Sequence, residues 1–574
     1  MPPTQIKTRS ESVPPDLLTA YPPLIAQLYA NRGVSSLDEV PRKLDALPHF
    51  ECLFGIQDAV ELLFRHLAAQ HTITIVGDYD ADGATSTSVL TLGLSMMGAK
   101  NVNYVVPNRF EYGYGLSVPI VELILAQQQS TSLIITVDNG ISSIDGVAFA
   151  KEQGLDVLIT DHHLPGTELP KADAILNPNQ PECEFPSKAL AGVGVVFYFL
   201  IALRRSLESK GWFESEQLKA PNLGQLLDLV ALGTVADVVP LDPINRLLVH
   251  QGLQRIRAGR GRPLINALIE LSKKSYAQVS AQDIAFGIAP KLNAAGRLDD
   301  MGLGIDGLVT RDEQKAQLIA AQLDELNSER KAIEKSMQVE AEQVLNQLEL
   351  GENLPNGVCI FEPSWHQGVV GLLASRIKDK YHRPVVAFAE GDDGTLKGSA
   401  RSIEGLHIKD AFELVASRHS GLILKFGGHA MAAGLSISAS SYQAFKQSFE
   451  QVMDELLADT KLERIFWTDG ELGAEQLTIE TAEQIYHAGP WGQAFPEPLF
   501  RGRFEVIQQR IVGANHLKLV LSPDHGRTLI DAIWFNANRA TVEKQVEVVY
   551  SLDINEYRGR RSLQLMVRHL VELR

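Results

Sequence analysis

The sequence is poor in the features that mark secreted, disulfide-stabilised and membrane-spanning proteins. Its 574 residues include only three cysteines, whose spacing matches neither a disulfide framework nor a metal site. No apolar run approaches the roughly 20 residues that a transmembrane helix needs, and residues 1–16 lack the apolar core of a secretory signal. We therefore expect a cytoplasmic protein with reduced thiols and no contact with a membrane.

Positive charge is also in short supply. The chain has 53 Lys and Arg against 70 Asp and Glu, which gives a net charge of −17. Such an excess of acid argues only weakly against nucleic acid as a partner, because binding depends on local patches and not on the sum. Residues 501–574 reverse the balance, with 12 Lys and Arg against 8 Asp and Glu, so an anionic partner is best sought there.

The remaining composition is that of an ordinary globular protein, with 45% hydrophobic and 21% charged residues. The length exceeds what one hydrophobic core can serve and predicts three or four domains. We expect an N-terminal cap (1–70), an α/β domain (71–310), a connecting helix (311–350), a second α/β domain (351–460), and a linker with a small β-barrel (461–574).

Short β-rich runs alternate with helical segments in the first α/β domain. The runs lie at residues 72–76, 102–106, 133–137 and 156–160. This alternation predicts βαβ units, and hence a parallel sheet with helices on both faces. Further on, the charge-rich and Gly- and Pro-free pattern after residue 311 predicts one long helix. The short alternating strands after residue 500 predict the barrel.

Acidic residues and histidines follow three of the four predicted strands. They are Asp78, Asp80 and Asp82 after the first strand, Asp138 after the third, and Asp161, His162 and His163 after the fourth. The carboxyl ends of parallel strands meet at one edge of a sheet, where ligands bind. Carboxylates this close repel one another unless a cation lies between them, and carboxylate and imidazole donors suit Mn²⁺ or Mg²⁺. The sequence therefore predicts a divalent-metal site at this edge.

Each of these motifs also has an ordinary structural interpretation. Alternating aspartates can form a solvated acidic turn, the Asp-Asn-Gly run a simple turn, and the His-His pair a structural contact. Three such endings in one sheet favour the metal site. Two further carboxylates, Asp228 and Asp237, lie in the apolar run 227–240. A buried carboxylate is costly unless it is paired or bound to metal, so either could complete the site, and spacing alone does not separate them.

The motifs together resemble those of a known family, the DHH phosphoesterase superfamily. Its four signature motifs are similar to residues 77–83, 138–140, 161–163 and 233–240, and its DHH-associated domain is similar to residues 427–434. Nearly the whole chain, including the barrel, resembles the bacterial members that are single-strand-specific DNA exonucleases working from the 5′ end. The resemblance implies the DHH fold, the associated domain and an OB-like barrel.

The resemblance also implies a role for each residue of the predicted metal site. The metal ligands would be Asp80, Asp82, Asp138, His162 and Asp237. Asp78 and Asp161 would orient the metal-bound groups, and His163 would lie beside the scissile phosphate. The preference for Asp237 over Asp228 rests on the resemblance.

Two further sets of residues are implied for binding DNA. Those that would grip the 5′ phosphate are Arg109, Arg297, Ser399, Arg401 and His429, although each arginine also fits an ordinary ion pair. Those on the barrel that would track the single strand are His516, Lys518, Tyr557, Arg558, Arg560 and Arg561, together with Trp534, which fits the barrel core equally well.

The function implied is hydrolysis of single-stranded DNA from the 5′ end with release of mononucleotides, in recombination and mismatch repair. Two divalent ions, Mn²⁺ or Mg²⁺, would serve as cofactors. The family suggests single-strand-binding protein and a helicase as partners, and we expect a monomer. The alternatives are a DHH-type phosphodiesterase acting on short oligonucleotides or cyclic dinucleotides, and a scaffold without activity. The added length and the basic end favour a polymer substrate.

Overall fold

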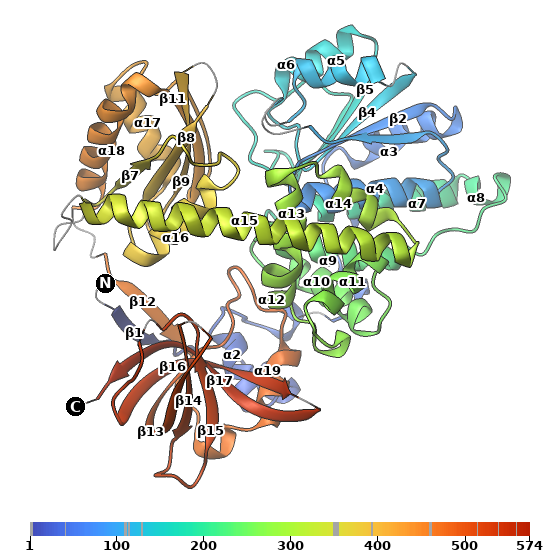
Figure 1. Ribbon diagram of the computed structural model, residues 1–574. Coiled ribbons are helices and arrows are strands. Elements are labelled where there is room, and N and C mark those ends of the chain that lie inside the picture. The colour runs from blue at the N-terminus through green and yellow to red at the C-terminus, as the bar shows by residue number, and fades with distance from the viewer. Residues whose placement is uncertain are drawn as a thin grey trace. The chain divides into compact units, whose positions relative to one another are not determined.

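The computed structural model describes residues 4–40, 42–107, 112, 115–127, 130–347, 355–391, 394–458, 462–513, 515–537, 539–557 and 559–573. The chain divides into two compact units (Figure 1). The large unit consists of Thr8–Asp324 and Thr468–Arg574, and the small unit of Met1–Lys7 and Glu325–Trp467. The finer domain boundaries expected from the sequence stay a prediction.

A five-stranded parallel sheet lies in the large unit, in the order β3-β2-β4-β5-β6. Its strands are β2 (Thr72–Gly77), β3 (Val102–Val105), β4 (Thr131–Val137), β5 (Asp156–Thr160) and β6 (Ala174–Leu176). The first four confirm the predicted strands. The sequence did not predict β6, because three residues are too few to produce a recognisable alternation.

Helices cover both faces of this sheet, as predicted (Figure 1). One face is covered by α5 (Val118–Gln127) and α6 (Ile144–Glu152), and the other by α3 (Ile56–Ala68), α4 (Ala81–Met96) and α7 (Gly192–Ser209). Buried aliphatic side chains of β2, β4 and β5 pack against α5 and α6. Burying each such side chain stabilises the fold by about 1.5–3 kcal/mol, which fixes the strands and therefore the residues at their ends.

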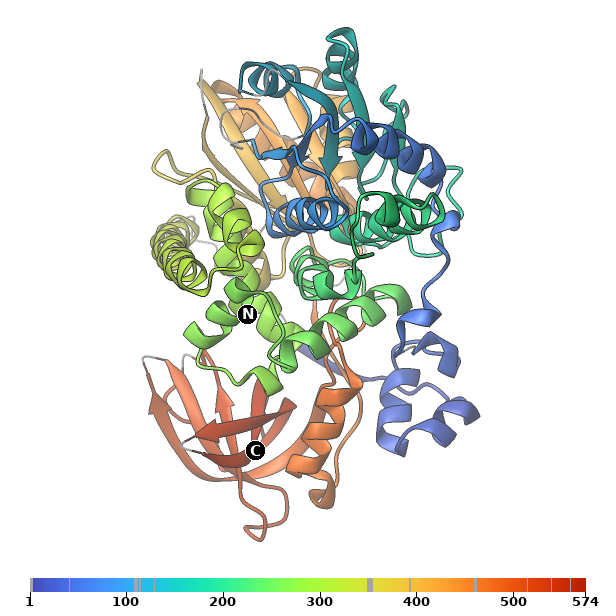
Figure 2. The same ribbon diagram turned by 90° about the vertical axis from the view of Figure 1, so that its right-hand side faces the viewer.

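A group of helices continues the large unit after the sheet. They are α8 (Trp212–Ser215), α9 (Leu227–Ala236), α10 (Pro243–Arg257), α11 (Pro263–Leu271), α12 (Ala281–Asp283), a π-helical turn η6 (Ile284–Ile288), α13 (Ala289–Leu298) and α14 (Gly302–Val309). Helices α9 to α13 of this group lie between the sheet and the barrel in both views, whereas α8 lies beside the end of α7 (Figure 1 and Figure 2). The long helix predicted after residue 311 is α15 (Glu313–Gln347), which begins in the large unit and continues into the small one.

The small unit contains a second five-stranded sheet, in the order β10-β11-β9-β8-β7. Its elements are β7 (Val358–Phe361), α16 (Val370–Tyr381), β8 (Val385–Glu390), β9 (Thr395–Arg401), α17 (Ile408–Arg418), β10 (Lys425–Gly428), β11 (Ala432–Ser438) and α18 (Tyr442–Leu456). Only the β7–β8 pair is parallel among these described strands. The second α/β domain is thus confirmed, with a largely antiparallel sheet.

The C-terminal strands close into a barrel in the order β13-β14-β15-β17-β16. They are β13 (Phe500–Val512), β14 (His516–Ser522), β15 (Ile530–Trp534), β16 (Gln545–Tyr557) and β17 (Arg560–Glu572). The barrel confirms the prediction, but three of its strands have 13 residues and are longer than expected. Register shifts at Val506/Gln508 and Val549/Tyr550 let such long strands bend around the barrel.

The N-terminal segment packs against the chain that leads into the barrel. Its elements are β1 (Thr4–Thr8), α1 (Pro15–Ala20) and α2 (Pro23–Ala30), and its partners are β12 (Arg464–Thr468), which pairs with β1, and α19 (Ile479–Ala488). The Tyr29 hydroxyl of α2 donates to the Ala488 carbonyl at 2.8 Å. Of the helices that the structure describes, none has the length and apolar character needed to cross a membrane.

Candidate metal centre and phosphate-binding groups

The predicted metal-site residues meet at the carboxyl edge of the parallel sheet. Because β2, β4 and β5 are neighbours, the residues that follow them converge. Three groups have donor atoms within 4.8 Å of one another: Asp78, Asp80 and Asp138; Asp138, His162 and His163; and Asp82, His162 and Asp237. His162 Nε2 lies 3.1 Å from Asp138 Oδ1 and 3.5 Å from Asp237 Oδ2.

Asp80 and Asp82 are held by the start of two helices. Asp80 is the N-cap of α4, and its Oδ1 accepts the backbone N–H groups of Asp82 and Gly83, each at 3.0 Å. Asp82 accepts the N–H groups of Gly192 at 2.7 Å and Val193 at 3.0 Å, in the first turn of α7. These amides have no partner inside their own helix, and the N-terminal end of a helix favours a negative charge.

Asp138 occupies the centre of the cluster in an unusual backbone conformation. Its φ of +62° lies in the left-handed region, which a non-glycine residue adopts at a cost. The start of α7 passes very close to Asp138, since a Cβ added at Gly192 would lie 2.7 Å from Asp138 Oδ1. A side chain larger than hydrogen at position 192 would therefore displace this carboxylate.

Asp161 holds the two histidines that follow it. Its Oδ1 accepts the N–H groups of His162 at 2.7 Å and His163 at 3.1 Å, and lies 2.7 Å from His163 Nδ1. Its Oδ2 accepts the Ile141 N–H at 2.9 Å. With this many contacts the carboxylate orients both residues, which is the geometry of the supporting role implied by the resemblance.

The structure separates Asp237 from Asp228, which spacing had left open. Asp237 caps the C-terminal end of α9 and reaches His162. Asp228 is fully buried elsewhere, where its Oδ2 accepts the Arg262 N–H at 2.6 Å and its Oδ1 lies 3.6 Å from Arg255 Nε. Asp228 thus pairs with arginine, and Asp237 is the one that joins the cluster.

The electrostatics of the cluster favour bound cations. Burial and then repulsion from Asp237 and Asp80 raise the pKa of Asp82 well above its usual range. Burial and repulsion from Asp82 do the same to the pKa of Asp138. Burial and the Asp80 charge raise the pKa of Asp237 to about 7. Divalent cations relieve such repulsion, and this donor set of carboxylates and imidazoles is the one that Mn²⁺ and Mg²⁺ accept.

The three donor groups overlap in a way that fits two ions. Asp78, Asp80 and Asp138 form one set, while Asp82, His162 and Asp237 form another that shares no residue with it. Asp138 also lies against His162 of the second set, so it lies between the two donor sets. The geometry further places Asp78 within ligand range, closer to the cluster than a purely supporting role requires.

His163 is the cationic member of this edge. Burial opposes the charged imidazolium, but the hydrogen bond and charge of Asp161 outweigh it and raise the pKa of His163 to about 9. The same contact lowers the pKa of Asp161 despite its burial. His163 is therefore positively charged at neutral pH.

Two of the predicted phosphate-binding residues lie together in the small unit. Arg401 Nη1 lies 3.1 Å from Ser399 Oγ at the end of β9, and a Cβ added at Gly371 would lie 2.9 Å from both side chains. Gly371 is in the first turn of α16, so a helix N-terminus adjoins the pair, which suits a phosphate. His429 is exposed just after β10, and its N–H donates to the Ala432 carbonyl.

The other two members of that set belong to the large unit. Arg297 is on α13 of the large unit, and Arg109 lies outside the described residues.

The barrel candidates are spread over its surface. His516 accepts the Asn536 N–H at 3.1 Å, Lys518 pairs with Asp531 at 3.0 Å, and Arg561 pairs with Glu483 at 2.7 Å. Arg560 is exposed at the start of β17 and Tyr557 ends β16, whereas Arg558 lies outside the described residues. Trp534 ends β15 and is only partly buried.

Sequence reasoning missed an aromatic group beside His516. Phe535 is 50% exposed, and its ring centre lies 5.0 Å from that of His516 in an edge-on arrangement. The neighbouring Trp534, which the sequence analysis singled out, is partly buried, and its role stays a prediction. Exposed aromatic rings on an OB-like barrel are the usual platforms for nucleic-acid bases.

Sequence reasoning also missed the way in which α13 supports the aspartate loop. The Asn293 Oδ1 accepts the Ala81 N–H at 2.8 Å, and a Cβ added at Gly296 would lie 1.8 Å from the Tyr79 carbonyl oxygen. Only glycine allows this approach. The small residues of the run 294–296 were the available signal.

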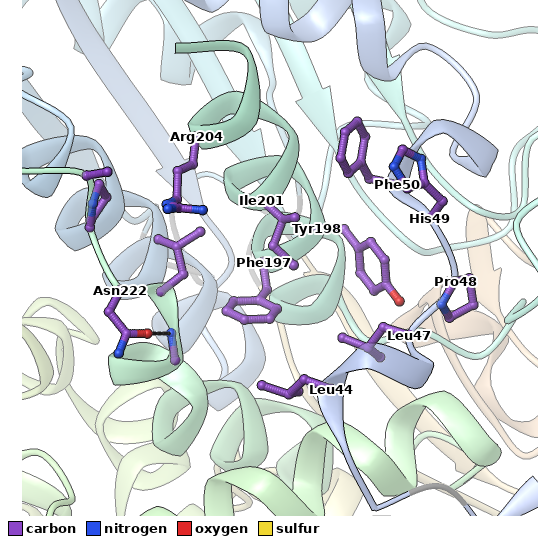
Figure 3. A pocket seen from close by; sticks show the side chains of 14 residues that line it. Leu44, Leu47, Pro48, His49, Phe50, Phe197, Tyr198, Ile201, Arg204 and Asn222 are labelled. Atoms are coloured by element: carbon purple, nitrogen blue, oxygen red, sulfur yellow. Dashed lines mark hydrogen bonds between the residues drawn. The ribbon is translucent and has the colours of Figure 1, made fainter. Parts of the chain in front are cut away.

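A cavity of about 520 Å³ lies along α7 (Figure 3). Its lining includes Phe197, Ile201 and Arg204 of α7 and the segment around Leu47 and Phe50. The lining contains no carboxylate, so this cavity does not have the donors of a divalent-metal centre. Among the described residues, the groups that could hold a metal ion lie at the edge of the sheet.

Three protein families match successive parts of the chain. The DHH family, N-terminal domain, matches residues 72–234, the DHHA1 domain matches residues 355–455, and the RecJ OB domain matches residues 468–569. The matched regions contain the parallel sheet, the second sheet and the barrel, respectively. The fold expected from the sequence is therefore confirmed.

Individual relatives match over nearly the full length. The single-stranded-DNA-specific exonuclease RecJ of Dickeya dadantii is 53% identical over 574 residues, covering 99% of each chain. The protein of the same name from Escherichia coli is 49% identical over 571 residues, again covering 99% of each. The crystal structure of RecJ from Thermus thermophilus in complex with Mn²⁺ superposes with a TM-score of 0.80 at 28% identity, covering 100% of this chain and 80% of that one. This chain belongs to the RecJ family of the DHH phosphoesterases.

Proposed function

We propose that this chain is a divalent-metal-dependent exonuclease that degrades single-stranded DNA from the 5′ end and releases mononucleotides. The observation that carries the proposal is the 3.1 Å contact between Asp138 and His162, which joins two groups of metal-donor atoms. It occurs in a chain whose relatives named single-stranded-DNA-specific exonuclease match almost end to end.

We assign the metal-binding role to Asp80, Asp82, Asp138, His162 and Asp237. When bound there, two ions of Mn²⁺ or Mg²⁺ supply Lewis-acid activation of water and stabilise the charge that develops on the phosphodiester. The chain's part is to hold the ligands in place. Asp78 also lies in range of this set, so its proposed role extends from orientation to contact with an ion.

His163 and Asp161 act as a pair beside the scissile phosphate. Asp161 keeps the imidazole oriented and charged, since the pKa of His163 is about 9. A positive N–H donor stabilises the extra negative charge of the phosphorane-like transition state, which is the usual use of such preorganised donors. His163 therefore lowers the barrier without exchanging its proton.

The preference for a 5′ terminus follows from the phosphate-binding groups. Arg401 and Ser399 lie in contact beside the N-terminal turn of α16. A terminal phosphate carries more charge than an internal diester, and a guanidinium binds it through two parallel hydrogen bonds. We propose that His429 joins this pair in the small unit. For Arg297 and Arg109 of the large unit we propose phosphate binding on the family resemblance alone.

The barrel holds the remainder of the strand. Its exposed Arg560 and the His516–Phe535 pair offer charge and an aromatic surface, the combination by which OB-like barrels bind single strands. A phosphodiesterase for dinucleotides has no use for such a surface. The polymer substrate is therefore favoured over the short-substrate alternative.

The biological setting is proposed on family resemblance. It comprises a monomer acting in the cytoplasm in recombination and mismatch repair, with single-strand-binding protein and a helicase as partners.

The proposed function is tested by digesting DNA labelled at either end. Single- and double-stranded substrates, with and without a 5′ phosphate, are incubated with the full-length protein in Mn²⁺, Mg²⁺ or a chelator. We expect metal-dependent release of mononucleotides from the 5′ label of single strands. Release from the 3′ label first, equal digestion of duplex, or digestion of dinucleotides alone would overturn the proposal.

A further inference from the structure

Phe286 is exposed to an unusual degree for an aromatic residue. Its side chain is 81% accessible, the highest value among the large apolar side chains that the structure describes. A single exposed apolar residue is common on protein surfaces and by itself carries no conclusion. Whether the exposure of Phe286 has a functional role depends on the residues that precede and follow it and on their contacts.

The backbone around Phe286 is a π-helical turn. It occupies η6 between α12 and α13, and Ile284 and Ile288 anchor it in the interior with 0% and 2% exposure. The preceding helix α12 begins at a capping box in which Ser280 and Asp283 satisfy each other's backbone N–H groups. Single π-turns within helices are frequent at functional sites. The ring is therefore presented to solvent by an anchored segment.

Phe286 begins a stripe of accessible residues that leads along α13. The partly or fully exposed positions are Phe286, Pro290, Asn293 and Arg297, whereas Leu292 and Ala295 between them are buried. Spacings of three and four residues place Pro290, Asn293 and Arg297 on one side of α13, and Phe286 precedes them in the π-helical turn. An aromatic ring thus lies at one end of the stripe and a guanidinium at the other.

The α13 part of the stripe contacts the loop that carries Asp80 and Asp82. Asn293 accepts the N–H of Ala81, between the two ligands Asp80 and Asp82, at 2.8 Å. Phe286 precedes Asn293 by seven residues, which corresponds to roughly 10 Å along a helix axis. The ring is therefore outside the reacting centre but within reach of a strand that leaves it.

The near end of the stripe leads to the barrel. The Gln278 Nε2, eight residues before Phe286, donates to Glu556 Oε2 at 2.8 Å. Glu556 lies near the end of β16, whose hairpin partner β17 begins with Arg560 and Arg561. Both contacts are within the large unit, so the segment containing Phe286 connects the barrel hairpin to the aspartate loop.

We propose that Phe286 is a base-stacking residue for the single strand as it passes from the metal centre toward the barrel. The proposal rests on the function proposed above. An aromatic face accepts any base without regard to sequence and needs that base unpaired. Phe286 would therefore contribute to affinity and to the preference for single strands, as a positioning residue that does not touch the scissile bond.

The test compares Phe286→Ala, Phe286→Leu and Phe286→Trp in the full-length protein. Binding of a 5′-phosphorylated strand of about 20 nucleotides, longer than the 4–16 that one OB fold covers, is measured by fluorescence anisotropy in chelator. Removing one stacking contact is expected to weaken binding about 5- to 100-fold in the Ala and Leu variants. Phe286→Trp is expected to bind as the wild type does, because it keeps an aromatic face.

A second readout separates stacking from a structural effect. A 5′-phosphorylated dinucleotide is too short to span the metal centre and Phe286, so kcat/KM for it should be the same in all four proteins. For the long strand, KM should rise while kcat is kept. Phe54→Ala serves as the control, since this phenylalanine is 46% exposed and lies outside the stripe.

The outcomes that overturn the proposal are distinct from those that overturn the function. If Phe286→Ala binds and digests the long strand as the wild type does, the stacking role is wrong. It is also wrong if long and dinucleotide substrates lose activity equally, or if tryptophan does not restore binding. Failure of the wild type to digest single strands would instead contradict the proposed function.

Discussion

The sheet edge and the barrel differ in how far their charged side chains are exposed. At the sheet edge the exposed fraction is at most 2% for Asp82, Asp138 and Asp161, whereas on the barrel the side chains of Arg560 and Arg561 are exposed to solvent. At the sheet edge each carboxylate is fixed by backbone N–H groups or histidine, and like charges lie close together. On the barrel, charges are spread out and several are paired with acids. The first arrangement suits catalysis at a single bond, and the second suits sequence-independent binding along a polymer.

The contrast shows that the unfavourable energy of charge repulsion is concentrated at the sheet edge. A buried like-charge cluster is costly to build, and its repulsion is relieved when cations or protons bind it. A removed ligand should therefore affect activity far more than binding of the strand. Exposed charges on the barrel contribute individually little, so their removal should affect binding by small and additive steps.

The largest effect is expected at the ligands. Asp138→Ala, His162→Ala and Asp237→Asn should each lower kcat by more than about 100-fold, since even groups behind metal ligands are worth 10–100-fold. Binding of a single strand in chelator should stay within a few-fold of the wild type. Single-turnover digestion and anisotropy measure the two quantities.

Asp228→Asn is the matched control for Asp237→Asn, because both residues come from the same apolar run. It leaves the metal centre intact and disturbs the contacts with Arg255 and Arg262. Its thermal stability should fall while kcat of the folded protein is kept. Equal loss of kcat in both variants would contradict the separation of these two carboxylates.

The second-largest effect on kcat is expected at Asp161, the residue that supports His163. Asp161→Asn should lower kcat about 10- to 100-fold, because it disturbs both histidines. It also removes the charge that raises the pKa of His163 to about 9. The imidazolium is kept below that pKa and lost above it, so the alkaline limb of the pH–rate profile should move to lower pH in the variant. An unchanged limb would show that another group controls it.

The third prediction concerns stability without metal. The pKa of Asp237 rises from 3.8 to about 7 on folding, so the folded state holds a proton that the unfolded state has lost, and stability falls as pH rises through that interval. His163 acts in the same direction between 6.5 and about 9. Asp161, whose pKa is lowered, titrates below 3.8 and does not affect this window.

The melting temperature of the metal-free protein should therefore decline from pH 5 to pH 8. Saturating Mn²⁺ should remove most of that decline, because the cations neutralise the carboxylates that pH would otherwise charge. Scanning calorimetry with and without Mn²⁺ measures this. A decline of equal slope in both conditions would mean that the cluster does not bind the ion.

The smallest effect is expected on the barrel. Replacing both Arg560 and Arg561 with alanine should weaken binding of long strands a few-fold and lower the salt slope of binding by about 0.7 for each phosphate that is no longer neutralised. The cleavage rate at saturating substrate should not change. Arg568→Ala is the control, since that arginine lies further along β17, away from the hairpin, and is paired with an acid as Arg561 is. Equal effects in both proteins would remove the special role of the hairpin.

The sheet edge could be predicted because strand ends and parallel pairing follow from short-range pattern. β2, β4 and β5 are long enough to be recognised, and their following residues then had to converge. The choice between Asp237 and Asp228 could not be made from spacing, because it depends on where α9 ends and on the distant Arg255 and Arg262. Tertiary packing decided it.

The surface features were harder to predict for a related reason. Phe535 and Trp534 are adjacent, and which of them faces solvent depends on where β15 ends. The exposure of Phe286 depends on a π-helical turn, which no periodicity of 2 or 3.6 residues indicates. The exposure of these aromatic side chains is thus set by local irregularities of the backbone, which sequence patterns do not reveal.

The stoichiometry of Mn²⁺ binding tests the central claim most directly. Equilibrium dialysis of the full-length protein, followed by metal analysis, should give two ions per chain. Asp138→Ala, which removes the carboxylate between the two donor groups, should bind fewer, while Asp228→Asn should still bind two. A wild-type protein that binds no ion at millimolar Mn²⁺, or an Asp138→Ala protein that still binds two, would contradict the account.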